Sequence, residues 1–130
     1  KILVVDDSKS DTMIISNMLK DFSLLTAGDG IEAMEMIQSD PEIAIMILDI
    51  NMPRMNGFEV LEAMEETGNK KIATIILTNY DEIDNEIRGL ELGALDYIRK
   101  PLNIRSLRKR IELHVNLKNA QLALEQHNFI

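Results

Sequence analysis

Five side chains have the types and spacing that suggest chemistry at a single site. Each follows a short apolar run of the kind that forms a buried strand: Asp6, Asp7, Asp49, Thr78 and Lys100. The carboxyl ends of parallel strands lie at one edge of an α/β sheet, and ligands bind in the crevice beyond that edge. We therefore expect these five side chains to converge.

Three carboxylates at one sheet edge would repel one another. At about 5 Å and an effective dielectric near 20, each pair costs roughly 3 kcal/mol, and one lysine offsets only part of this. A hard divalent cation with oxygen ligands relieves the repulsion, so the sequence predicts a Mg2+ site in which Mn2+ can substitute. Each residue taken singly also has an ordinary structural interpretation, such as Asp capping the next helix; it is the combination that favours a site.

The elements that must position this site alternate along the chain. Apolar runs of strand length are separated by stretches of helical period, which predicts an α/β fold with a doubly wound five-stranded parallel sheet. Because the runs do not alternate with polar residues, helices should cover both faces. The predicted strands are Ile2–Val5, Leu24–Ala27, 43–48, 72–77 and 95–98.

Apolar stripes at helical spacing predict the covering helices. The first stripe follows the candidate caps Ser10 and Asp11, the third follows the turn Asn56-Gly57, and the fourth should end at Gly93. In chain order, the stripes are Met13, Ile14, Met18 and Leu19; Ile31, Met34 and Ile37; Phe58, Leu61 and Met64; and Ile83, Ile87 and Leu90.

The segment from Asn103 to His127 contains no Gly or Pro and predicts one long helix. Ile104, Leu107 and Ile111 suit packing on the sheet, so we assign residues 1–115 to the domain and 116–130 to a helical extension. A second stripe has coiled-coil spacing over two heptads: Leu113, Leu117, Ala120 and Leu124. We expect the extension to lead to an output domain or a dimer partner; an amphipathic tail covering its own domain is the alternative.

Composition excludes several classes of protein. The 130 residues are 45% hydrophobic, enough for one globular domain, and the absence of Cys excludes disulfides and thiolate metal sites. The two His argue against a His-rich zinc site. No apolar run approaches the roughly 20 residues of a membrane span, and no secretory leader opens the chain. We therefore expect a cytoplasmic protein that does not contact membranes.

Charge is unevenly divided. Residues 1–98 carry a net charge of −13 and residues 99–130 a net charge of +5. The acidic body argues against direct binding of nucleic acid by this chain. The local basic cluster is interpreted as the solvated face of a helix: Arg105, Arg108, Lys109 and Arg110.

Several motifs resemble the receiver domain of bacterial two-component response regulators over roughly residues 1–115. They are Val5-Asp6-Asp7-Ser8, Leu48-Asp49-Ile50-Asn51-Met52-Pro53 with Met55-Asn56-Gly57, Ile76-Leu77-Thr78, Gly93-Ala94 and Tyr97-Ile98-Arg99-Lys100-Pro101. The resemblance implies the flavodoxin-like strand order 2-1-3-4-5 with an extended C-terminal helix. It also implies that the chain is the N-terminal part of a longer multidomain regulator.

The resemblance implies a phosphoacceptor site. Asp49 would take a phosphoryl group from a sensor histidine kinase, a phosphotransfer protein or a small donor such as acetyl phosphate. Asp7, Asp49 and the backbone carbonyl of Asn51 would bind Mg2+ directly, and Asp6 mainly through a metal-bound water. The chain would catalyse only its own phosphorylation and dephosphorylation, and is therefore not an enzyme in the usual sense.

The resemblance also implies a switch. The ammonium of Lys100 would neutralise the phosphoryl oxygens during transfer, the Thr78 hydroxyl would bond one of them afterwards, and Tyr97 would turn inward. The fourth helix, fifth strand and fifth helix would then move, controlling an output domain (of diguanylate cyclase, HD-GYP or kinase type) or a partner, including a homodimer through the C-terminal helix. The Lys100–Pro101 bond is expected to be cis.

Two departures from the family pattern concern access to Asp49. Asn79 follows Thr78 where the family usually has a small residue, which would narrow the approach to the phosphoryl group. Asn51 and Tyr80 occupy positions that tune the attack of water on the aspartyl phosphate.

Three other functions are compatible with parts of this pattern. A phosphatase of the haloacid dehalogenase type needs Asp-x-Asp after the first strand, whereas Asp49 follows the third and is followed two residues later by Asn51. A flavodoxin-like cofactor binder needs a phosphate loop where Asp6 and Asp7 stand. A degenerate receiver that only binds a partner is the serious alternative, and the presence of all five site residues argues against it.

Overall fold

The protein is described by a computed structural model that covers residues 1–69, 71–79 and 82–127. Strands and helices alternate along this part of the chain. The strands are β1 (Ile2–Val5), β2 (Leu24–Ala27), β3 (Ile45–Asp49), β4 (Ala73–Asn79) and β5 (Asp96–Lys100). The helices are α1 (Lys9–Met18), α2 (Gly30–Ser39), α3 (Gly57–Glu66), α4 (Ile83–Glu91) and α5 (Ile104–His127).

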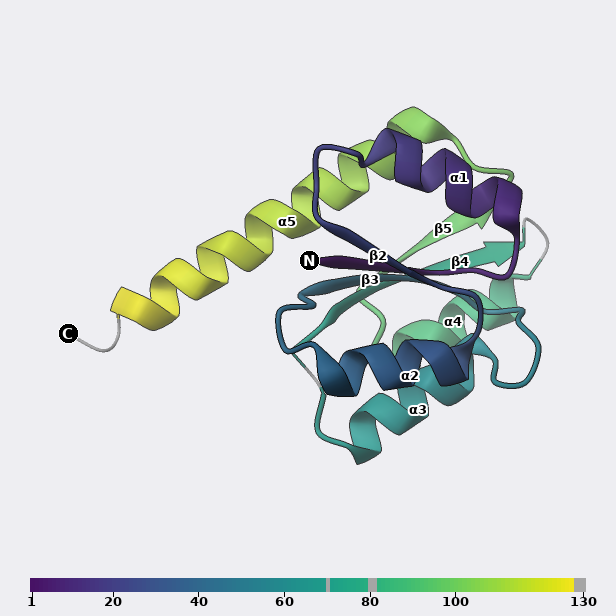
Figure 1. The fold of residues 1–130 in the computed structure, drawn as a ribbon, viewed down its shortest axis with the longest axis horizontal. Coiled ribbons are helices and arrows are strands. Elements are labelled where there is room, and N and C mark those ends of the chain that lie inside the picture. Colours follow the sequence, from purple (N-terminus) through teal and green to yellow (C-terminus); the bar gives the residue numbers. More distant parts are fainter. Residues whose placement is uncertain (70, 80–81, 128–130) are drawn as a thin grey trace.

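The strands form one parallel sheet in the order β2-β1-β3-β4-β5. Helices α1 and α5 cover one face, and α2, α3 and α4 cover the other (Figure 1). The predicted fold class and strand order are therefore confirmed. The register places Val5 beside Leu48, Asp49 beside Leu77 and Asn79 beside Lys100, so the carboxyl ends of β1, β3, β4 and β5 share one edge.

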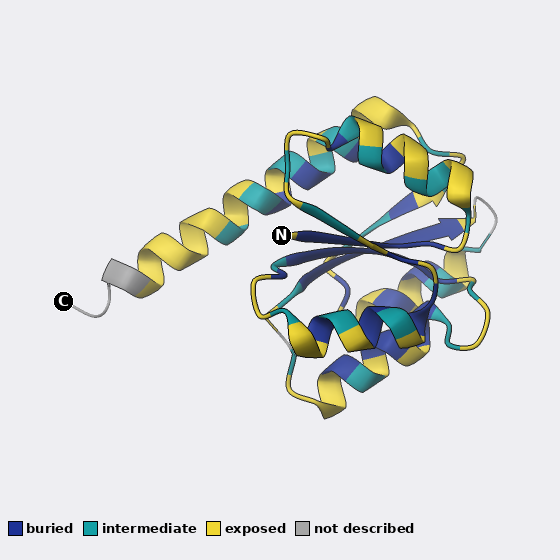
Figure 2. Ribbon diagram, viewed as in Figure 1, coloured by how far each residue is buried: buried dark blue, intermediate teal, exposed yellow. Residues whose placement is uncertain are grey.

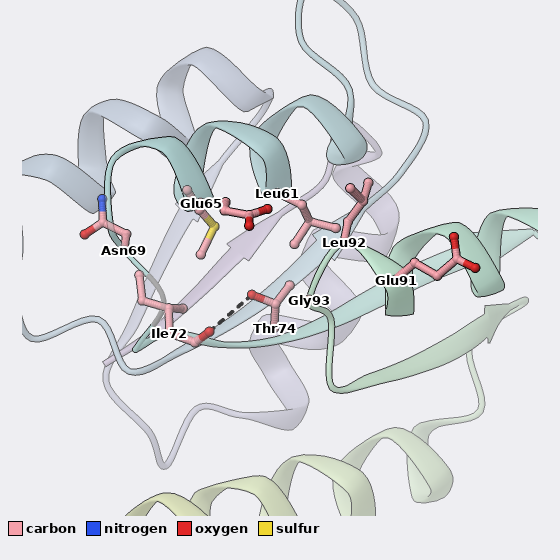
Figure 3. A pocket seen from close by; sticks show the side chains of 9 residues that line it. Leu61, Glu65, Asn69, Ile72, Thr74, Glu91, Leu92 and Gly93 are labelled. Carbon is pink, nitrogen blue, oxygen red and sulfur yellow. Dashed lines mark hydrogen bonds between the residues drawn. The ribbon is translucent and has the colours of Figure 1, made fainter.

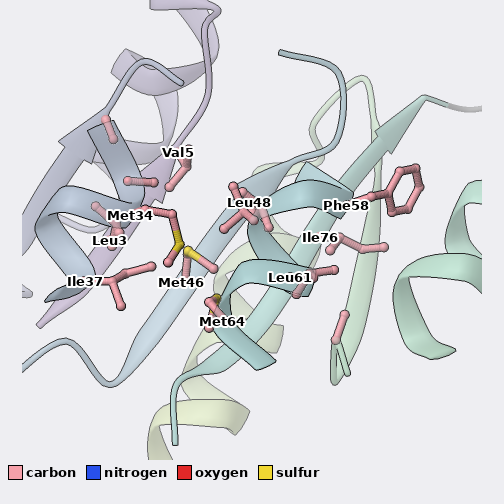
Figure 4. Packing of buried hydrophobic residues seen from close by; sticks show 14 of the residues in the cluster. Leu3, Val5, Met34, Ile37, Met46, Leu48, Phe58, Leu61, Met64 and Ile76 are labelled. Atoms are coloured by element: carbon pink, nitrogen blue, oxygen red, sulfur yellow. The ribbon is translucent and has the colours of Figure 1, made fainter. Parts of the chain in front are cut away.

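Successive strand residues point to opposite faces and build two cores. Leu3, Met46 and Ile76 pack with residues of α2 and α3 on one face, as Figure 4 shows. Ile47 and Leu107 belong to the second core, beneath α1 and α5. Residues of the inner strands β1, β3 and β4 are buried on both faces (Figure 2), which explains their uninterrupted apolar runs in the sequence.

The strand predictions differ from the structure mainly at the ends. β3 begins two residues later than expected, at Ile45, and β4 and β5 continue through Asn79 and Lys100. Backbone pairing with neighbouring strands extends past the last apolar residue of each run, because hydrogen bonds do not depend on side-chain polarity. Asp49, Thr78 and Lys100 therefore belong to the strands themselves, whereas Asp6 and Asp7 follow β1.

The stripe predicted for α4 was wrong. Ile83, Ile87 and Leu90 are 57%, 51% and 42% exposed, and the helix instead faces the sheet with Glu86 and Gly89. A Cβ at Gly89 would lie 2.3 Å from the Cδ1 atom of Ile76, so a larger residue there would require the end of the Ile76 side chain to move. The side chain of Glu86 can be buried because it pairs with Arg99, at 2.5 Å. Since the inward residues are a glutamate and a glycine, apolar spacing does not reveal the inner face of α4.

The prediction for α1 was wrong at its start and on part of its face. Ser8 caps the helix, in place of Ser10 and Asp11, by accepting a hydrogen bond from the backbone N–H of Asp11. Starting the helix at this cap turns Ile15 and the C-cap residue Leu19 inward. The rest of the expected stripe lies outward or at the margin: Met13 and Ile14 are exposed and Met18 is partly buried.

The predictions for the second and third stripes agree better with the observed burial. In α2, Met34 and Ile37 are buried, whereas Ile31 is exposed because it lies in the first turn, outside the inner face. In α3 the whole predicted stripe is buried, and Asn56 caps the helix in a capping box with Glu59.

Helix α5 begins on the sheet and then leaves the domain. Leu107 and Ile111 are buried as predicted, whereas Ile104 is exposed in the first turn. Residues 119–125 are all exposed, and the helix projects away from the domain (Figures 1 and 2). The tail therefore does not cover its own domain. The stripe Leu113, Leu117, Ala120 and Leu124 is exposed throughout.

Candidate functional site

Three carboxylates meet at the carboxyl edge of the sheet. One oxygen from each of Asp6, Asp7 and Asp49 lies within 4.8 Å of the others. Asp6 and Asp49 are buried and Asp7 is exposed, so the cluster has a dry side and a side open to water. Hard carboxylate oxygens with room for water ligands suit a divalent cation such as Mg2+. The donor set therefore fits the metal expected from the sequence.

Backbone contacts hold these carboxylates in place. Asp6 follows β1, and its N–H donates to the carbonyl of Ala27 at the end of β2. Its Oδ1 atom accepts from the N–H of Ser8 at 2.9 Å, just before α1 begins. Asp49 ends β3, and its Oδ1 atom accepts from the N–H of Asn51 at 3.4 Å. The position of Asn51 near the cluster is thus set by Asp49 itself.

The loop after β3 is packed tightly against that strand. A Cβ at Gly57 would lie 2.6 Å from the carbonyl oxygen of Asp49, closer than real Cβ contacts allow. The N–H of Gly57 donates to Ile50, which draws the start of α3 under the site. Arg54 has a φ of 63° and pairs with Asp29, the residue that caps α2. The loop that carries Asn51 is therefore fixed at both ends.

Lys100 closes the site from β5. Its Nζ atom lies 3.0 Å from Oδ2 of Asp6, 2.9 Å from Oδ2 of Asp11 and 3.6 Å from Oδ2 of Asp49. The following Lys100–Pro101 peptide bond is cis, as predicted. Asp11 was not singled out from the sequence as a site residue; its place in the first turn of α1, the helix that follows Asp6 and Asp7, is the signal that could have found it.

Burial dominates the electrostatics of the site. Burial, reinforced by the nearby charge of Asp6 and opposed by Lys100, raises the pKa of the Asp49 carboxyl to about 7. Burial alone would lower the pKa of Lys100, but Asp11, Asp49 and Asp6 together hold it above its ordinary value. The ammonium is therefore charged at neutral pH, while Asp49 requires a nearby cation to be fully ionised.

Thr78 lies near the end of β4, on the strand next to Asp49. It is 1% exposed, and its Oγ1 atom is the buried side-chain polar atom without a hydrogen-bond partner in the described part of the chain. A buried hydroxyl without a partner costs stability, so Thr78 Oγ1 has a hydrogen bond to offer a ligand.

A second polar group borders the site on the α4 side. The carboxylate of Glu82, just before α4, accepts from the side-chain amides of Asn51 and Asn79, each at 3.4 Å, and from that of Asn85. Sequence reasoning missed Glu82, since no apolar run precedes it. The expected effect of Asn79 on access stays a prediction, and Tyr80 lies outside the described residues.

Tyr97 lies on β5, beside Ile76 of β4. It is partly buried against the core that α2 and α3 cover, and the Arg99 guanidinium lies 5.8 Å from its ring centroid. Of the predicted site residues, the contacts described above bring Asp6, Asp7, Asp49 and Lys100 together.

A separate hollow of about 270 Å³ lies away from this edge. Figure 3 shows it between the end of α3, the start of β4 and the end of α4, with Thr74 bonded to the carbonyl of Ile72. Its lining includes Glu65 and Glu91 but none of the predicted site residues. The carboxylate cluster, rather than this hollow, is the candidate functional site.

Within the described residues, no helix combines the length and apolar character needed to cross a membrane.

Comparisons with known proteins agree on one family. The protein-family model of the response regulator receiver domain matches residues 2–112 of this chain. The transcriptional regulatory protein CpxR of Escherichia coli (strain K12) is 37% identical over 113 residues, covering 85% of this chain and 47% of that protein. This chain spans about half the length of the curated relatives it matches.

Solved structures give the same result. The signal receiver domain of a Luxo repressor protein from Vibrio parahaemolyticus has a TM-score of 0.87 and 25% identity, with 95% of each chain covered. The chemotaxis protein CheY4 of Vibrio cholerae has a TM-score of 0.77 and 32% identity, covering 85% of this chain and 94% of that one.

Proposed function

Because this chain belongs to the response regulator receiver domain family of two-component signalling, we propose that it accepts a phosphoryl group on Asp49 in a Mg2+-dependent reaction. The donor is a sensor histidine kinase, a phosphotransfer protein or a small molecule such as acetyl phosphate. The observation that best supports this is the three-carboxylate cluster with Lys100 beside it, because it pairs a buried acceptor with a cation site.

The proposed ligands combine the observed carboxylate cluster with the roles that the family resemblance implies. Asp7 and Asp49 bind Mg2+ directly together with the backbone carbonyl of Asn51, and Asp6 acts mainly through a metal-bound water. The bound ion supplies positive charge, which keeps Asp49 ionised and offsets charge on the transferring group. The same carboxylate oxygens would also suit Mn2+ in place of Mg2+.

Phosphoryl transfer is a displacement at phosphorus. A carboxylate oxygen of Asp49 forms a bond to phosphorus while the bond to the leaving group breaks; acetyl phosphate then releases acetate with the bonding electron pair. Lys100 donates hydrogen bonds to the equatorial oxygens. The Thr78 hydroxyl, which has no hydrogen-bond partner among the residues that the structure describes, donates to one of them after transfer.

The product differs from the free protein mainly in charge. Phosphorylation replaces one carboxylate charge by roughly −1.5 to −2 and adds strong acceptor oxygens. Thr78 and Lys100 reach those oxygens by moving, and Tyr97 turns inward as space opens beside Thr78. As a result, the population shifts toward a conformation in which the face formed by α4, β5 and α5 has moved.

The output follows from the place of α5. This helix begins on the switching face and projects from the domain, so it can relay the change to an output domain or to a second copy of the chain. We propose a homodimer through the exposed stripe of α5 and a cytoplasmic location for the protein. The names of the curated relatives, a transcriptional regulatory protein and response regulators, support a signalling role.

The decisive test uses acetyl phosphate and Mg2+ with intact-mass detection. The wild type should gain one phosphoryl group, Asp49→Asn should gain none, and Glu35→Gln, which changes an exposed carboxylate on α2, should label like the wild type. EDTA should abolish labelling. Undiminished labelling of Asp49→Asn would refute the acceptor, and a wild type that is never labelled would instead indicate a receiver that only binds its partner.

A further inference from the structure

Lys100 is shared between the acceptor and two other carboxylates. Its two short contacts, at 2.9 and 3.0 Å, are with Asp11 and Asp6, whereas Asp49 lies 3.6 Å away. The longer separation exceeds that of a normal charge-assisted hydrogen bond. The ammonium is therefore held by residues other than the acceptor.

The two competing carboxylates differ in their relation to the cation site. Asp6 belongs to the cluster, so a bound cation offsets its charge. Asp11 is not in that cluster, and its carboxylate lies on α1 instead. With Mg2+ in place, the charge of Asp11 still attracts Lys100.

The pair between Asp11 and Lys100 is anchored and partly shielded. The side chains are 24% and 18% exposed, so water screens their attraction less than it screens a surface pair. Asp11 is fixed in the first turn of α1, where its N–H donates to the Oγ atom of Ser8 at 3.3 Å. The competition for Lys100 is thus built into the start of a helix.

We propose that Asp11 is a positioning residue that holds Lys100 back from Asp49 and so slows phosphoryl transfer. The inference rests on the proposed function and names a restraint on that same site. Without the charge of Asp11, Lys100 is freer to contact the phosphoryl oxygens, which speeds transfer. Loss of the Asp11 charge also removes a negative charge near the cation site, and it lets Lys100 approach Asp49. Both changes weaken Mg2+ binding.

Asp11→Asn tests this because it removes the charge and keeps the size of the side chain. Calorimetric titration of the metal-free 130-residue protein gives the Mg2+ dissociation constant, and intact mass gives the initial rate of labelling by acetyl phosphate at saturating Mg2+. We expect the dissociation constant and the rate each to rise about three- to tenfold. Asp11→Glu should restore values near the wild type, and Glu35→Gln should change neither.

The opposite effects on affinity and rate separate positioning from damage to the fold, which would weaken binding and slow labelling together. An unchanged or slower rate for Asp11→Asn, beside a wild type labelled on Asp49, would overturn the inference and leave the proposed function standing. A wild type that binds Mg2+ but is never labelled would refute both the inference and the proposed function.

Discussion

At the scale of single residues, the site sets groups against one another. Asp49 is buried beside Asp6, which raises its pKa, while Lys100 divides its contacts among three carboxylates. Among the described residues, the hydroxyl of Thr78 has no hydrogen-bond partner. Groups held in unfavourable surroundings are characteristic of functional sites, because the strain is relieved when the ligand arrives.

The raised pKa of Asp49 predicts how the metal-free protein responds to pH. Between the ordinary value of 3.8 and about 7, the folded state binds more protons than the unfolded state. Stability should therefore fall as pH rises through this window, with the full penalty above it. At 1.36 kcal/mol per pH unit, the loss from Asp49 is at most about 4 kcal/mol.

Urea denaturation in EDTA at pH 5 and pH 8 measures this effect. Asp49→Asn should gain more stability over the wild type at pH 8 than at pH 5, and saturating Mg2+ should reduce that gain. A difference between the two proteins that does not vary with pH would show that Asp49 titrates normally.

At the scale of elements, close backbone contacts place the site. α3 begins with a glycine packed against the carbonyl of Asp49, and α4 lies on β4 through Gly89. Around Asp49 the loop is further fixed by the pairing of Arg54 with Asp29. The site is therefore supported by packing that the functional side chains do not provide.

Gly57→Ala tests the support beneath Asp49. The added Cβ would lie 2.6 Å from the Asp49 carbonyl oxygen, so either β3 or the start of α3 must shift. We expect a loss of about 1–3 kcal/mol in unfolding free energy and a several-fold weaker affinity for Mg2+, measured by urea denaturation and calorimetry.

Gly28→Ala is the matched control, because its Cβ would meet only the Glu32 side chain at 3.7 Å. Equal effects of the two substitutions would contradict a specific role for the contact at Gly57.

At the scale of the whole molecule, α5 is the element that begins in the domain and extends beyond it. Its inner face contributes Leu107 and Ile111 to the core, and Arg108 ties it to Asp21 near the end of α1. Residues 119–125 are all exposed, and so are the large apolar side chains of Leu113 and Leu117. A helix of this kind is poorly stabilised alone, so pairing with a second helix is expected.

Leu117→Glu tests pairing through the exposed stripe. A charge at the centre of the proposed seam should weaken dimerisation at least tenfold in sedimentation velocity, with and without beryllofluoride. Leu122→Glu is the control, because Leu122 is also exposed but lies outside the stripe. A wild type that sediments as a monomer under both conditions would exclude the dimer, and equal effects of the two variants would exclude this stripe as its seam.

The sequence by itself determined the fold class, the strand order through family resemblance, and the identity of the residues at the strand ends. This succeeded because a parallel sheet buried on both faces requires apolar runs, and each run ends where the polar site begins. The stripe of α3, after the turn Asn56-Gly57, followed from local spacing alone.

Only the tertiary structure decided which faces turn inward and which charges meet. The inner face of α4 is made by a glycine and a paired glutamate, so apolar spacing predicted the wrong side. Asp11 and Lys100 are far apart in the sequence yet 2.9 Å apart in space. Such contacts depend on how helices settle on the sheet, and local hydrophobic periodicity carries no information about a partner on a distant strand.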